Sequence, residues 1–77
     1  MYRYISKKEI LFTSELGVYV TYGVQALEQS PGGWIQRGFV SDVAADPSVT
    51  EALAQRFTLA QLSPLHLDDV ILDLLDS

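Results

Sequence analysis

Residues 18–27 alternate between two sets of side chains without interruption, and this period of two is typical of a β-strand with one buried face. The first set is apolar and contains Val18, Val20, Tyr22, Val24 and Ala26. The second set is mixed and contains Tyr19, Thr21, Gly23, Gln25 and Leu27. We expect the first set to face the core. The glycine inside the strand, Gly23, indicates a bulge or a close approach of another backbone.

Turn signals lie on both sides of this strand. Residues 14–17 can reverse the chain, with Gly17 available for a positive φ. Residues 28–33 contain Pro-Gly-Gly and form the strongest turn signal of the sequence. Runs of β-forming residues predict further strands over residues 2–5, 9–13 and 34–43. Both faces of residues 34–43 carry apolar side chains, which indicates a central strand, and the register of this strand is left open. Whether residues 2–5 pair with the sheet is also left open.

The second half of the chain predicts two helices. Asp46 can cap the first helix and Pro47 suits its first position, while Ser48 and Glu51 offer a competing capping box. The apolar side chains that recur at helical spacing, and that should lie on the sheet, are Val49, Ala52, Leu53, Phe57 and Ala60.

Ser63 and Pro64 end the first helix and begin the second, with Ser63 as its N-cap. Asp68 and Asp69 fall in the first turn, where the helix dipole favours negative charge. The apolar stripe consists of Leu67, Val70, Ile71, Leu74 and Leu75. The sequence therefore predicts an α+β fold, a three- or four-stranded antiparallel β-meander followed by two C-terminal helices packed on one face.

Length and composition restrict the classes of protein that fit. A chain of 77 residues suffices for one core, so we expect a single domain over residues 1–77. Cysteine is absent, which excludes disulfides and cysteine-based zinc sites. Residues 1–10 lack the apolar core of a signal peptide, and no apolar stretch reaches the ~18 residues of a membrane span. We therefore expect a cytoplasmic protein that does not bind membranes.

The charge is unevenly distributed along the chain. The net charge is +1 over residues 1–41 and −6 over residues 42–77. Binding to a phosphate backbone depends on Lys and Arg, and the chain has five of them against ten Asp and Glu. This balance argues against direct binding of nucleic acid.

Two segments resemble a family of small proteins of unknown function from Firmicutes (DUF6514). They are Tyr22-Gly23-Val24 with the following residues 39–46, and the closing segment 62–75, LSPLHLDDVILDLL. Leu74-Leu75 stands where the family carries a phenylalanine. The resemblance implies a bacterial cytoplasmic origin and marks His66 and Asp69 as motif positions, and it brings no activity with it.

The closing segment holds the candidate site residues. His66, Asp69 and Asp73 share a helical face at i, i+3 and i+7, a possible metal or acid–base set. One histidine without cysteine makes a poor metal cage, so we interpret the aspartates as a solvated face and predict no cofactor and no metal site.

Leu65 and Leu72 lie opposite the apolar stripe of the second helix, on a face shared with Asp69 and Asp76. An apolar spot within an acidic face is a plausible site for a protein partner or for self-association. The predicted interaction surface therefore comprises Leu65, His66, Asp69, Leu72, Asp73 and Asp76.

Three functions from different classes remain open. The first is a non-enzymatic protein-interaction module, which the small size and the missing catalytic set favour. The second is an acidic mimic of nucleic acid that inhibits a basic protein, which the pI near 4.4 permits. The third is a small metal-dependent or acid–base enzyme centred on His66.

Overall fold

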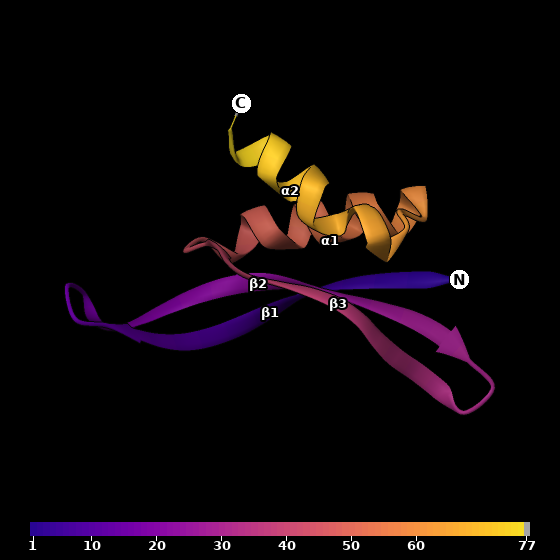
Figure 1. The fold of residues 1–77 in the computed structure, drawn as a ribbon, viewed down its shortest axis with the longest axis horizontal. Coiled ribbons are helices and arrows are strands. Elements are labelled where there is room, and N and C mark those ends of the chain that lie inside the picture. Colours follow the sequence, from indigo (N-terminus) through magenta and orange to yellow (C-terminus); the bar gives the residue numbers. More distant parts are fainter. Residues whose placement is uncertain (77) are drawn as a thin grey trace.

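The computed structural model describes residues 1–76 and consists of a sheet with a layer of helices on one of its faces (Figure 1). The sheet is antiparallel with the order β1 (Tyr2–Thr13), β2 (Gly17–Ser30), β3 (Gly33–Ala44). Two helices follow, α1 (Pro47–Ala60) and α2 (Leu67–Leu75), joined by the 3₁₀ turn η1 (Pro64–His66). The predicted α+β fold is confirmed, with three strands.

The two short N-terminal strands of the sequence analysis are one strand. β1 pairs with β2 without a register shift from Tyr2, opposite Glu28, to Thr13, opposite Gly17. The polar residues 6–8, which were expected to separate two strands, continue the pairing. An edge strand tolerates such residues because one side of it meets solvent.

β3 is an edge strand, so the prediction of a central position is wrong. Its apolar side chains are divided between the two faces because the strand is irregular. Val40 and Ala44 pair with Val24 and Tyr22, so three β3 residues lie opposite the single residue Gly23. The bulge predicted from this glycine is therefore confirmed.

The predicted start of α1 is confirmed, but its buried face is rotated. Asp46 caps the helix, since its carboxylate accepts hydrogen bonds from Ser48 N and Oγ, both 2.9 Å long. These bonds lower the pKa of Asp46. Of the predicted stripe, Phe57 is buried and Leu53 half-buried, while Val49, Ala52 and Ala60 are exposed. Side chains missing from the prediction complete the buried face, and they are Thr50 and Ala54.

The predicted cap Ser63 opens η1 and accepts from Leu65 N, and α2 begins only at Leu67. Leu67 and Ile71 are fully buried, as the apolar stripe predicted. The prediction is wrong for the end of the stripe, because Leu74 and Leu75 are 39% and 55% exposed.

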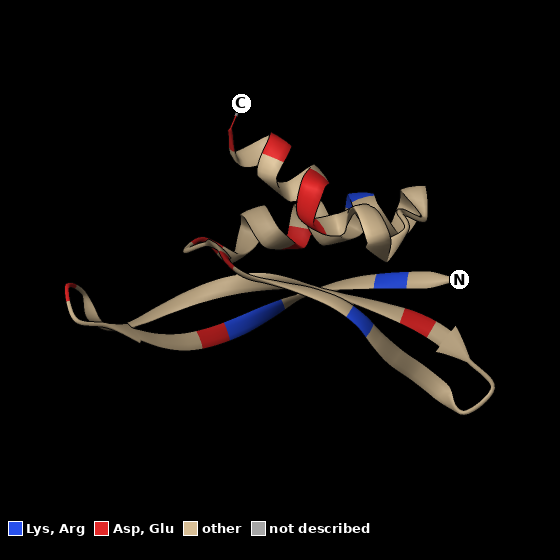
Figure 2. Ribbon diagram, in the orientation of Figure 1, with Lys and Arg blue, Asp and Glu red and all other residues tan. Residues whose placement is uncertain are grey.

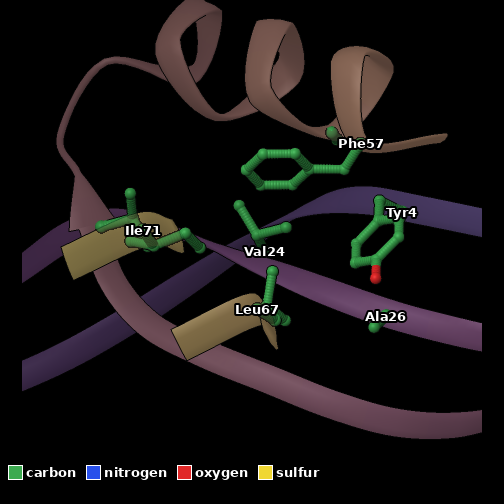
Figure 3. Packing of buried hydrophobic residues seen from close by; sticks show 8 residues of the cluster. Tyr4, Val24, Ala26, Phe57, Leu67 and Ile71 are labelled. Atoms are coloured by element: carbon green, nitrogen blue, oxygen red, sulfur yellow. The ribbon is translucent and has the colours of Figure 1, made fainter. Parts of the chain in front are cut away.

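The core lies between the helices and the central part of the sheet (Figure 3). The rings of Tyr4 and Phe57 pack edge to face, with centroids 5.6 Å apart. Leu67 lies over Gly38, where a β-carbon would be 3.6 Å from Leu67 Cδ2, so a small residue lets α2 approach the sheet. The buried apolar residues are Tyr4, Val24, Ala26, Val43, Ala54, Phe57, Leu67 and Ile71.

Candidate interaction site

The helices are too short to cover the sheet. A twisted strand of 14 residues such as β2 spans roughly 40 Å, whereas a helix of 14 residues such as α1 spans roughly 20 Å. α1 lies along the first residues of β1, where Thr50 Oγ1 contacts Ser6 Oγ at 2.6 Å and Gln61 bonds the backbone of Tyr2. The β1–β2 hairpin therefore extends beyond the helices (Figure 1).

We call residues 10–20 the arm. Pairing with β3 ends at Tyr22, which lies opposite Ala44, so the arm is a two-stranded ribbon closed by the turn at residues 14–16. A two-stranded hairpin is only marginally stable by itself in water, and it is normally supported by a third strand or by a covering element. Within residues 1–76, no third strand pairs with the arm.

The arm carries an apolar surface on the side of the sheet that bears the helices. Ile10 pairs with Val20 and Phe12 with Val18, so these four side chains share one face, and we call them the arm patch. Their exposed fractions are 68% for Ile10, 72% for Phe12, 71% for Val18 and 46% for Val20. Leu16 at the tip is 70% exposed.

The arm patch corrects the prediction that Val18 and Val20 face the core. Both side chains lie on the same face as Val24 and Ala26, which are fully buried. The alternation predicted the face correctly. It could not predict where the covering helices end, because that depends on the lengths of elements elsewhere in the chain.

The outer edge of β1 is closed at one end and open at the other. Thr58 Oγ1 accepts from Tyr4 N at 2.8 Å, and Gln61 both accepts from Tyr2 N and donates to Tyr2 O. Backbone groups that face outward recur every second residue, so those of Lys8, Ile10 and Phe12 face the same way. Within residues 1–76, no helix or loop forms a hydrogen bond with the outward-facing backbone groups of Lys8, Ile10 and Phe12.

Polar residues fix the base of the arm on the opposite face of the sheet. Thr21 Oγ1 donates to Asp42 Oδ1 at 2.7 Å, and the Tyr19 hydroxyl donates to Asp42 Oδ2 at 3.0 Å. Ser41 Oγ and Asp42 N donate to the two carboxylate oxygens of Glu9, at 2.7 and 2.8 Å. The bond to Asp42, followed by partial burial and the nearby carboxylate charges, raises the pKa of Tyr19. This network ties β1 and β2 to the bulge of β3.

The predicted interaction surface on η1 and α2 is exposed to solvent. Leu65 is 88% exposed and Leu72 is 58% exposed. Leu65 also borders a shallow cleft of about 250 Å³ beside the Arg37–Glu28 ion pair, whose Nε–Oε1 distance is 2.9 Å. The remaining members of the predicted surface are exposed as well, and they are His66, Asp69, Asp73 and Asp76.

His66, Asp69 and Asp73 do not assemble into a metal cage. His66 belongs to the 3₁₀ turn, and the two aspartates follow on α2. In the part of the chain that the structure describes, no group of three or more His, Asp or Glu side chains is placed to hold a metal ion. The single helical face that sequence spacing predicted for these three residues is therefore interrupted, because His66 lies in η1 and the two aspartates lie in α2.

Acidic side chains dominate the helical layer, whereas the strands carry both signs of charge (Figure 2). Along the hairpin, Lys7, Lys8 and Glu9 precede the arm and Glu15 lies in its tip, so the arm patch between them has no charged member. Within residues 1–76, no helix has the length and apolar character needed to cross a membrane.

Comparisons with family models, with curated proteins and with solved structures found no match. The resemblance to the Firmicutes family therefore stays a prediction.

The arm patch is the surface that the sequence analysis missed. A signal for it was present, because the apolar alternation begins at Val18 and continues through Ala26. The strand over residues 18–26, paired with residues 10–13 and the strand before them, forms a hairpin that is longer than helices of ordinary size can cover.

Proposed function

We propose that this domain is a non-enzymatic protein-interaction module and that the arm patch is its binding surface. The observation that supports the proposal is a row of four large apolar side chains, exposed on a ribbon with one open edge. Together these side chains expose on the order of 500 Å², near the upper end of the largest apolar patches on monomeric proteins, about 300–600 Å². Patches of this size are commonly functional.

The energetic argument points the same way. Apolar area returned to water costs about 25 cal/mol per Å² relative to burial, so covering the arm patch would supply on the order of 10 kcal/mol before the costs of association. A docked partner would also provide the support that a two-stranded ribbon lacks. We place this interaction in a bacterial cytoplasm, as the family resemblance and the absence of cysteine suggest.

Site-specific photo-crosslinking tests the proposal. A photoreactive phenylalanine analogue replaces Val18 in the arm patch, Leu65 in the surface predicted from the sequence, or Leu59, a helix residue that is 79% exposed. Irradiation in a bacterial host should give a discrete protein adduct from position 18 and none from position 59. Adducts from position 65 alone would move the binding surface to η1 and α2, and equal labelling at all three positions would contradict the proposal.

The same photoreactive variants, irradiated in a bacterial lysate at different salt concentrations, separate the module from the nucleic-acid mimic. A mimic would bind through the exposed carboxylates of the helical layer, such as Asp69 and Asp73. Its adducts would form near α2 and disappear as salt screens the charges. Adducts through the arm patch should persist at about 0.5 M salt, because apolar contacts are not screened.

A further inference from the structure

The chemical character of the arm patch suits contact with a second copy of the same patch. Its side chains are all apolar, and the charged residues of the hairpin lie before it or at the tip. A two-fold axis brings the same patch of two subunits together, so apolar groups meet apolar groups and no charge is buried. We infer, as an extension that rests on the proposed function, that the arm patch binds the arm patch of a second copy of this chain, with the two arms stacked face to face and antiparallel.

Charges at the two ends of the arm favour this arrangement. Lys8 pairs with Tyr22 and so precedes the arm patch on the same face, and Glu15 lies in the turn at the far end. The middle of the patch is about midway between these two residues along the hairpin. A two-fold axis through the middle therefore places Lys8 of each copy near Glu15 of the other, giving two ion pairs that fix the register.

Space for a second arm is present. Thr50, in the first turn of α1, contacts Ser6 of β1, and the arm begins four residues further along that strand. A stacked sheet lies about 10 Å above the first, so the second arm would occupy the level of the helices without crossing them. In Figure 1, the helices of residues 1–76 do not extend over the tip of the arm.

The area is sufficient for a weak and reversible dimer. Two arm patches bury on the order of 1,000 Å² when stacked, which reaches the lower limit for specific interfaces. Interfaces at this limit are commonly transient. We expect a dissociation constant of about micromolar or weaker.

Sedimentation velocity of the full chain from about 1 μM to 1 mM tests the inference. The wild type should shift from monomer to dimer, and Phe12→Ser should raise the dissociation constant at least about tenfold. The control is Leu59→Ser, which removes an apolar side chain of similar exposure from α1 and should leave the constant within about twofold.

Charge reversal gives a second test that does not depend on the stability of the arm. Lys8→Glu alone or Glu15→Lys alone should raise the dissociation constant about threefold to tenfold, and the double variant should restore it. Failure of the double variant to restore dimerisation would overturn the antiparallel stack. Slow amide exchange at Ile10 and Phe12 in the dimer would overturn it as well, because it would mean that two β1 edges pair instead.

The outcomes also separate this inference from the proposed function. A wild type that is monomeric at every concentration but gives an adduct with a different protein at position 18 would overturn the inference that a second copy binds. The proposal of an interaction module would be kept. A monomer with no adduct at position 18 would overturn both.

Discussion

Gly23 is the residue on which the close approach of β3 to β2 depends. A β-carbon at this position would lie 2.5 Å from the carbonyl oxygen of Val40 and 2.8 Å from the ring of Phe39. The first of these neighbours is backbone and cannot move aside cheaply. Opposite this glycine, Asp42 adopts a positive φ of 55° and spans the bulge with its side chain.

Gly23→Ala should therefore destabilise the fold by about 1–3 kcal/mol, as overpacking does in other cores. Urea unfolding measures this free energy. The matched control is Gly32→Ala in the β2–β3 turn, where an added β-carbon meets nothing within 4 Å and the change should stay within about 0.5 kcal/mol. Equal losses in the two variants would show that the contact at Gly23 is not tight.

Tyr4 makes stability depend on pH in the alkaline range. Burial, followed by the charge of Tyr2, raises its pKa from 10.0 to about 12. The folded state thus retains a proton that the unfolded state loses, and stability is complete below pH 10 and declines as the pH rises towards 12. Between pH 10 and 12, ionisation of Tyr4 should lower the free energy of unfolding of the wild type by about 1.4 kcal/mol per pH unit.

Tyr4→Phe isolates this contribution. The variant loses the hydrogen bond from the Tyr4 hydroxyl to Leu62 O, which should cost about 1 kcal/mol at pH 8. Measured by urea unfolding at each pH, its deficit should shrink above pH 10, vanish at about pH 11 and have the opposite sign at pH 12. A deficit that is constant with pH would contradict the raised pKa.

Polar side chains of α1 set where the outer edge of β1 is closed and where it is open. The sequence predicted the existence and order of these elements well, because turn signals and alternation are local. It did not predict that residues 2–13 form one strand, or that Thr50 and not Ala52 lies on the buried face of α1. These features depend on contacts distant in sequence, such as Ser6 with Thr50.

Thr58→Val tests the closure of the edge. The change keeps the shape of the side chain but leaves Tyr4 N without its acceptor, and a buried unpaired donor should cost about 1–3 kcal/mol. Thr58→Ser keeps the hydroxyl and serves as the control. Amide exchange should show faster exchange at Tyr4 in the valine variant alone, and unchanged exchange there would mean that another group takes the role of Thr58.

The whole molecule consists of a long twisted sheet and a shorter helical layer, with extents of 43 × 31 × 20 Å. The core fills the part of the sheet that the helices reach, and the arm extends beyond it (Figure 1). The sequence analysis placed the interaction surface on η1 and α2, since it assumed that every apolar strand residue on the inner face is covered. The mismatch in length between strands and helices moves our proposal to the arm.

Amide NMR spectra of the full chain at about 50 μM and at about 1 mM test the account of self-association through the arm patch most directly, because a weak dimer shifts signals at its interface as concentration rises. The account predicts concentration-dependent shifts in residues 8–20 and none around Leu59. Shifts confined to Leu65, Leu72 and the rest of α2, or spectra that are identical at both concentrations, would contradict it.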